Sequence, residues 1–228
     1  PHMALSPLTA ISPVDGRYHE GLKHLSAYFS ESALIRYRLL VEVEYFNFLS
    51  EKKFVKISGK VHQKLRDLLN TFGEEEAAMI KKLEKTTNHD VKAVEYFLKQ
   101  KLMEWGAGDI REWVHFGLTS QDINNTAIPM LWKEAMECEL LPAILTLQHQ
   151  LKKMAEQWHQ VPMLARTHGQ PASPVTVGKE ILVFVERLES QIELISYIPY
   201  TGKFGGATGG FNAHYAAFPK YNWTEIGR

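Results

Sequence analysis

The sequence predicts an all-α protein in which a small N-terminal helical domain is followed by long helices of a helical bundle. Apolar residues recur at helical spacing through most of the 228 residues. Two of the periodic segments run much further than an ordinary globular helix. No run of alternating apolar and polar residues, internal repeat or low-complexity tract stands out, so a sheet protein is disfavoured.

Composition and charge exclude several classes of protein. Basic and acidic side chains each total 26, so no net charge favours nucleic acid or an anionic membrane as a partner. Cys138, the single cysteine, excludes an intrachain disulfide and a cysteine-based zinc cluster, and it suits a reducing compartment. No apolar run approaches the ~20 residues of a membrane helix. We therefore expect a cytoplasmic protein.

The N-terminal helical domain is expected to span residues 4–110, after residues 1–3, which we interpret as a cloning remnant plus the initiator Met3. Ser30 can cap the first amphipathic helix, and Asp90 can cap a later one. A stop is expected at Gly106. Periodic apolar residues predict further helices over 61–72, 74–83 and 91–102.

Residues 111–228 are expected to form the first part of a central long-helix bundle. Thr119-Ser120-Gln121-Asp122 is a capping sequence for a helix that runs to about His159, or about 60 Å. Pro129 and Pro142 lie inside this helix and should kink or interrupt it, because the apolar spacing resumes after each one.

A second long helix is predicted antiparallel to the first. After a polar connection over 161–172, Ser173 and Pro174 provide an N-cap and a first-turn proline for a helix to about Ile198. Two such helices cannot cover their own apolar faces, so other helices must pack against them. A candidate helix start, Thr224-Glu225, lies only a few residues before the last residue, Arg228. We therefore expect a chain that is truncated before the bundle is complete.

The connection between the long helices holds a candidate for proton transfer. His168 lies in Thr167-His168-Gly169-Gln170-Pro171, where a rigid scaffold can present it to a cleft. Imidazole exchanges protons near neutral pH, which suits a general acid or base. A turn histidine that bonds only to backbone is an equally good reading of the local sequence.

Two further turns can bind anions. In Thr86-Thr87-Asn88-His89-Asp90 and in Thr119-Ser120, short polar side chains precede a helix, where free amides and the helix dipole attract a carboxylate or phosphate. Simple helix capping is the stronger alternative at both places. Near the start, Arg17-Tyr18 offers a guanidinium and a phenol that suit a phosphate or a base.

We predict no phosphate-binding, metal-binding or catalytic role for the remaining motifs. Gly202-Lys203-Phe204-Gly205-Gly206 does not match the order of a phosphate-binding P-loop. The ten histidines include no HExxH spacing, so no metal site is predicted. His115, flanked by apolar residues, is expected to be a packed, hydrogen-bonded histidine.

The motifs occur in an order that resembles the bacterial adenylosuccinate lyases, over essentially the whole chain after its first residues. The matching segments are 12–18, TTNHDVKAVEYFL at 86–98, HFGLTSQDINN at 115–125 and RTHGQPASP at 166–174. The resemblance implies a member of the fumarase and aspartase superfamily. Such proteins are homotetramers with a central bundle of long helices, and several subunits build each active site.

The resemblance also implies the reaction. Fumarate is eliminated from adenylosuccinate, which gives AMP, and from the succinyl-carboxamide intermediate SAICAR, which gives AICAR. Neither step needs a metal or an organic cofactor. A base removes a carbon-bound proton beside a carboxylate, an acid protonates the departing amine, and preorganised donors stabilise the charge that builds on the carboxylate.

Site residues carry over from the matching motifs. His168 would be the general acid, with His89 orienting the substrate or tuning the charge nearby. The substrate-binding residues implied by the resemblance are Arg17, Tyr18, Asn88, His89, Asp90, Thr119, Ser120 and Thr167.

The base that the resemblance implies is a serine in a mobile loop with the motif SSxMPxKxNP, which has no match in this sequence. We therefore expect the chain alone to lack lyase activity and to bind AMP weakly, if at all. Two alternatives stay open: another fumarate-releasing lyase of the superfamily, such as an argininosuccinate lyase, and a non-catalytic helical assembly module.

Overall fold

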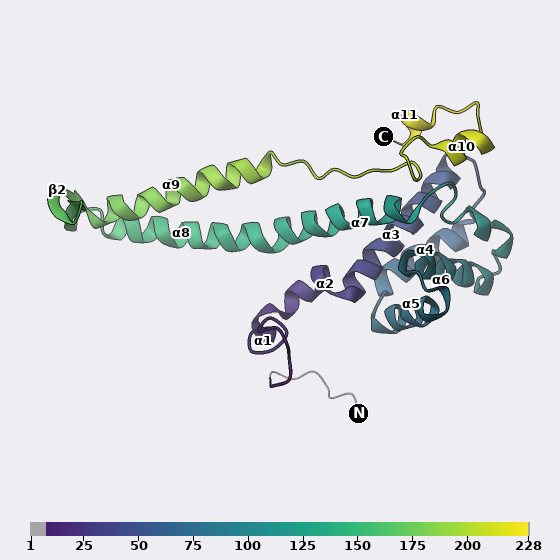
Figure 1. The fold of residues 1–228 in the computed structure, drawn as a ribbon, viewed down its shortest axis with the longest axis horizontal. Helices are drawn as coiled ribbons and strands as arrows, with labels where there is room; N and C mark the ends of the chain where they lie inside the picture. The colour runs from purple at the N-terminus through teal and green to yellow at the C-terminus, as the bar shows by residue number, and fades with distance from the viewer. Residues whose placement is uncertain (1–7, 228) are drawn as a thin grey trace. The chain divides into compact units, whose positions relative to one another are not determined.

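The computed structural model describes residues 8–227, which are predominantly helical (Figure 1), as the sequence predicts. The described residues form two compact units. The first comprises those up to Trp132 and those from Thr201 onward, and the second is Lys133–Tyr200. The expected cloning remnant lies outside the described residues, and the predicted domain boundary near residue 110 stays a prediction.

The first unit is built around one long helix, α3, whose start is fixed by a local cap. The Ala33 amide donates to Ser30 Oγ at 3.0 Å, which confirms the predicted cap. The helices of this unit are α1 His19–Leu22, α2 Ser26–Phe29, α3 Glu31–Glu51, α4 Gly59–Thr71, α5 Glu74–Thr87, α6 Asp90–Glu104, the beginning of α7 Ser120–Ala135, α10 Asn212–Ala217 and α11 Trp223–Ile226, with 3-10 turns at Lys23–Leu25 and Gly108–Trp113.

The core of this unit forms where α3 packs against α4, α5 and α6. Its fully buried side chains include Leu39 and Phe46 of α3, Leu65 of α4 and Phe97 of α6. Apolar side chains of this size each contribute about 1.5–3 kcal/mol when buried, so this contact holds the unit together. The turns that precede α6 and α7 are thereby attached to a rigid support.

The predicted start of α6 is wrong in one detail. His89, and not Asp90, is the N-cap: its Nδ1 accepts the Lys92 amide at 3.3 Å, while Asp90 is the first helical residue. Before it, α5 continues through Thr87, and Asn88 ends it in the left-handed conformation at φ 51°. Asparagine tolerates this conformation better than most residues, which explains why the helix ends there.

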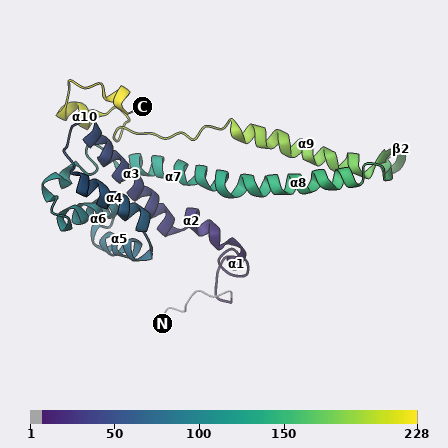
Figure 2. The same cartoon turned by 180° about the vertical axis from the view of Figure 1, so that it is seen from behind.

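The second unit is an antiparallel pair of helices joined by a hairpin (Figures 1 and 2). Its elements are a π-helical stretch Met136–Leu140, α8 Leu141–Gln157, β1 Pro162–Thr167, β2 Gln170–Thr176 and α9 Val177–Ser196. Pro129 lies inside α7, and Pro142 lies in the first turn of α8, just after the π-helical interruption. At Gly178, a Cβ would lie 2.3 Å from Ala155 O, so only glycine permits this approach of α9 to α8.

The hairpin corrects the predicted second helix. Residues 162–167 and 170–176 are strands, so Ser173 and Pro174 belong to β2, and Thr176 caps α9 by accepting the Lys179 amide at 3.3 Å. Proline is compatible with a two-stranded ribbon because each strand has an edge that needs no amide donor. Several apolar side chains of α9 stay exposed, among them Leu182 and Phe184, as expected of helices that need partners. No helix among residues 8–227 is both long and apolar enough to cross a membrane.

Candidate functional site

Two of the predicted turns meet on the first unit. Ser120 Oγ lies 3.2 Å from His89 Nε2, although the residues are 31 positions apart in the chain. His89 begins α6 and Ser120 begins α7, so the contact brings the starts of two helices together. Thr119 directly precedes Ser120, and Asn88 and Asp90 flank His89. Five of the nine predicted site residues therefore belong to one cluster, which we call the His89–Ser120 cluster.

Arg38, which the sequence analysis did not select, supports this cluster from α3. Its side chain is 7% exposed, Nη2 lies 2.7 Å from Asp90 Oδ2, and Nε donates to Asn124 Oδ1 at 2.9 Å. Burial alone would raise the pKa of Asp90, but the Val91 amide and the Arg38 guanidinium together lower it below its ordinary value. An arginine among apolar neighbours in a core helix was the available signal, because arginine is almost never buried without a partner.

A cleft of mixed charge lies beside these residues. Its lining comprises Glu31, Leu34, Arg38, Lys81, Glu84, Lys85, Asn88, His89 and Asp90. Lys81 lies 3.1 Å from Glu31 and 2.6 Å from Glu84, and these contacts raise its pKa. The cleft thus presents His89 and Asn88 at an open, polar surface suited to a charged small molecule.

Asp122 fixes the start of α7 by bonding both to Thr119, which precedes this helix, and to the glycine-rich segment at Lys203 and Gly206. The carboxylate is fully buried: Oδ2 accepts the amides of Thr119 and Gly206, each at 2.8 Å, and Oδ1 lies 2.9 Å from Lys203 Nζ. Lys203 also donates to Gly206 O. The predicted capping sequence is confirmed, and the glycine-rich segment is an anchor for it. One consequence is that the Thr119 amide is already occupied by Asp122.

His115, just before this turn, is packed and hydrogen-bonded as predicted. It lies at φ 61° with Nδ1 2.6 Å from Oε1 of the fully buried Glu42. Burial raises the pKa of Glu42, and the Glu42 carboxylate raises the pKa of His115 in spite of burial. The folded pair therefore binds more protons than the unfolded chain, so the stability it contributes is lost as pH rises.

We expect the contribution of this pair to the unfolding free energy of the first unit to fall as pH rises above the ordinary pKa values of its members, 4.5 for Glu42 and 6.5 for His115. Glu42→Gln should flatten this fall, whereas Glu44→Gln on the exposed side of the same helix should leave it unchanged. Urea unfolding at a series of pH values measures both. Burial lowers the pKa of His214, so the stability that this residue contributes is lost in the opposite direction, as pH falls below 6.5. An equal slope in the two variants would exclude the Glu42–His115 pair as its source.

Arg17 and Tyr18 are exposed on a separate turn of the first unit. The Tyr18 amide donates to Pro13 O at 3.0 Å, and the Arg17 guanidinium lies 5.5 Å from the Tyr18 ring centre. Within residues 8–227, neither side chain makes a hydrogen bond or ion pair to the His89–Ser120 cluster. The structure therefore does not bring these two predicted residues into the cluster.

Thr167 and His168 belong to the second unit, where His168-Gly169 is the two-residue loop between β1 and β2. Both loop residues have positive φ, 51° and 73°, as a type I′ hairpin turn requires. The His168 imidazole is exposed. A positive φ is uncommon for a non-glycine residue, and such conformations are frequent at functional sites.

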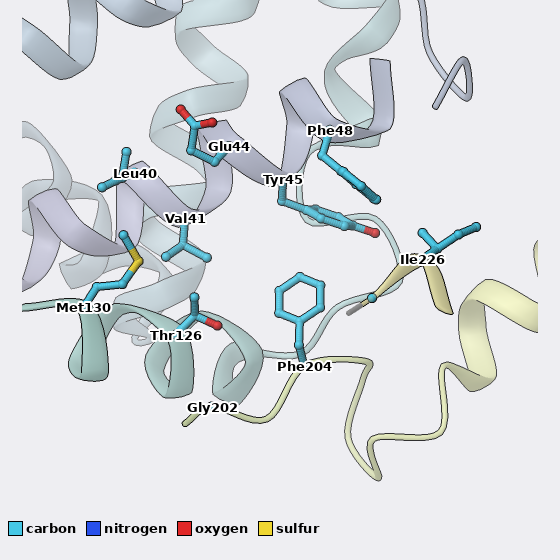
Figure 3. A pocket seen from close by; sticks show the side chains of 11 residues that line it. Leu40, Val41, Glu44, Tyr45, Phe48, Thr126, Met130, Gly202, Phe204 and Ile226 are labelled. Atoms are coloured by element: carbon cyan, nitrogen blue, oxygen red, sulfur yellow. The ribbon is translucent and has the colours of Figure 1, made fainter. Parts of the chain in front are cut away.

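A second hollow of about 400 Å³ on the first unit is apolar (Figure 3). Phe204 and Tyr45 both line it and contact each other edge to face, with ring centres 5.4 Å apart. The Tyr45 hydroxyl is already bonded to Phe116 O and His214 Nε2, each at 2.8 Å. Glu44 contributes a carboxylate to this largely apolar lining, but none of the predicted site residues lines the hollow, so it is not the candidate site. In the described part of the chain, no group of three metal-ligating side chains is found.

Comparison with known proteins identifies the family. The family described as Lyase matches residues 16–228. The chain belongs to this lyase family. Its relatives named adenylosuccinate lyase include that of Dictyostelium discoideum, which is 52% identical over 97% of this chain and 50% of the relative. Those of Vibrio cholerae and Escherichia coli K12 are each 42% identical over 98% of this chain and 50% of the relative. The chain thus spans about half the length of these curated relatives.

Solved structures of the lyase family's fold agree with the helical architecture. A fumarate lyase from Mesorhizobium matches with a TM-score of 0.69 at 20% identity, over 84% of this chain and 44% of that one. A β-carboxy-cis,cis-muconate cycloisomerase from Acinetobacter calcoaceticus also reaches 0.69, at 19% identity, over 90% of this chain and 46% of that one. At these identities the match establishes the fold alone.

Proposed function

We propose that this chain supplies the acid-bearing and substrate-holding part of an adenylosuccinate lyase. The reaction releases fumarate from adenylosuccinate, giving AMP, and from SAICAR, giving AICAR. The observation that carries the proposal is the 3.2 Å contact between His89 and Ser120, which unites two of the motifs that resemble this family. Relatives of that name at 42–52% identity support the choice of substrate.

In the proposed mechanism, a substrate carboxylate binds at Thr119 and Ser120, where hydroxyl donors and the start of α7 favour negative charge. Charge increases on this carboxylate when a base removes the neighbouring carbon-bound proton. The C–N bond then breaks, and His168 gives its proton to the departing nitrogen. Arg17 and Tyr18 are proposed to hold the phosphate, and Asn88, Asp90 and Thr167 the remainder of the substrate. We propose no metal or organic cofactor.

The base is proposed to be a serine on an SSxMPxKxNP loop, which has no match in these 228 residues. Because His168 and the His89–Ser120 cluster belong to different units, the proposal places them in one site only in the assembled enzyme. Exposed Leu182 and Phe184 on α9 support assembly through the long helices. We propose a homotetramer located in the cytoplasm.

The experiment is a chimaera in which this chain replaces the matching half of the Dictyostelium relative. We expect the purified chimaera to release fumarate from adenylosuccinate, and the 228-residue chain alone to release none. Fumarate is detected directly by proton NMR. A folded chimaera that releases fumarate from argininosuccinate and not from adenylosuccinate would overturn the substrate assignment. A folded chimaera inactive on both would favour the assembly-module alternative.

A further inference from the structure

The two ring nitrogens of His89 have different partners, and these partners determine where its proton lies. Nδ1 accepts the Lys92 amide at 3.3 Å, because His89 is the N-cap of α6. An amide can only donate, so Nδ1 must present a lone pair. In the neutral ring the proton is then on Nε2, which faces Ser120 Oγ at 3.2 Å.

Asp90 offers a competing arrangement. Its Oδ1 lies 3.4 Å from His89 Nδ1, so a proton on Nδ1 would bond to this carboxylate instead. Two contacts make Asp90 a weaker acceptor, however: Oδ1 already accepts the Val91 amide at 2.8 Å, and the carboxylate charge is paired with the buried Arg38 through Oδ2 at 2.7 Å. Arg38 therefore weakens the attraction of Asp90 for the His89 proton.

The position of the His89 proton also determines how the Ser120 hydroxyl can bond. A hydroxyl has one proton to donate, and its oxygen accepts. If Nε2–H donates to Ser120 Oγ, the Ser120 proton is free to point to a third group. An obligatory donor suits a carboxylate, which only accepts hydrogen bonds.

We propose that Arg38, Asp90 and the Lys92 amide hold His89 in the Nε2–H tautomer, and that His89 thereby makes the Ser120 hydroxyl a dedicated donor to the substrate carboxylate. His89 and Arg38 are positioning residues in this scheme, since they act through Ser120. The second clause rests on the proposed function, whereas the tautomer is a property of the chain without ligand.

Long-range proton–nitrogen NMR on the ¹⁵N-labelled chain, at about pH 8 where a free imidazole is neutral, reports which ring nitrogen carries the proton. His89→Gln identifies the signals by their loss. We expect one tautomer with Nδ1 bare and Nε2 protonated. A proton on Nδ1, or a mixture like that of free histidine, would overturn the proposal.

The variant Arg38→Gln tests whether Arg38 is a cause of the Nε2–H tautomer of His89. With its partner removed, Asp90 should draw the His89 proton to Nδ1, whereas Arg36→Gln, on the exposed side of the same helix, should leave it on Nε2. An unchanged tautomer in folded Arg38→Gln contradicts the role of Arg38. If that variant does not fold, Ser120→Ala serves instead. In it, the Nε2 signal of His89 should shift and the Nδ1 signal of His89 should stay. The absence of any shift contradicts the His89–Ser120 bond.

Failure here is separable from failure of the proposed function. If NMR shows the predicted tautomer but the chimaera is inactive, the local geometry is correct and the proposed substrate is wrong. In an active chimaera, His89→Asn keeps a good helix cap but is too short to reach Ser120 as well. We expect Ser120→Ala to raise KM about tenfold, because it removes a hydrogen bond to the charged carboxylate. His89→Asn should raise KM by less, because the Ser120 hydroxyl is still present but is no longer oriented by His89. An unchanged KM in His89→Asn would contradict the proposal.

Discussion

Replacing His168 in the active chimaera should lower kcat by about 10²- to 10⁴-fold, the usual contribution of a general acid. His168→Ala removes the imidazole, but alanine is strained at φ 51°. His168→Asn is the better variant, because asparagine tolerates this conformation and keeps the hairpin turn while it cannot act as the acid. Steady-state kinetics with adenylosuccinate measure the effect.

Nucleotide affinity should change little in the same variants, since the proton is transferred only in the transition state. His159→Ala is the matched control: this histidine is also exposed on the second unit, and its Nδ1 lies 2.7 Å from Glu156 O. It should retain near-normal kcat. Near-normal turnover in His168→Asn would remove His168 from the proposed mechanism.

Asp122→Ala should destabilise the first unit by about 3 kcal/mol, the lower end of the cost of breaking a buried pair. The change leaves the Thr119 and Gly206 amides and Lys203 without their shared acceptor. The Lys203 side chain is 35% exposed, so water can solvate it in part. We therefore expect the free-energy cost to lie at the lower end of this range. Urea unfolding monitored by circular dichroism gives the loss.

Asp109→Ala, which removes an exposed carboxylate from the same unit, should stay within about 0.5 kcal/mol of the parent chain. The Asp122 variant should also free the start of α7 from the glycine-rich segment. A loss below about 1 kcal/mol for Asp122→Ala would mean that other contacts hold this segment in place.

Local sequence patterns predicted most of the fold because helix signals act over short distances. Ser30 caps α3 through a residue three positions away, and the long helices follow from apolar spacing. The hairpin was missed because β1 and β2 are short and contain prolines, which suggested a loop. The His168-Gly169 pair was the available signal, since glycine favours the positive φ of a two-residue turn.

The candidate site was only partly predictable from the chain. Turns rich in polar residues indicated His89 and Ser120, but not that they touch. Asp122 and Gly206 are 84 positions apart, and Arg38 and Asn124 are 86 apart. No local pattern encodes such pairs, because they arise when core packing brings distant helices together. The supporting residues Arg38 and Asp122 were therefore missed as members of the site.

The most direct test of the account is a crystal structure of the His168→Asn chimaera with adenylosuccinate bound. We predict a substrate carboxylate within hydrogen-bonding distance of the Thr119 and Ser120 hydroxyls, the phosphate at Arg17 and Tyr18, and residue 168 facing the departing nitrogen. Nucleotide bound away from Ser120, with residue 168 in contact with none of it, would contradict the claim that these turns form one substrate site.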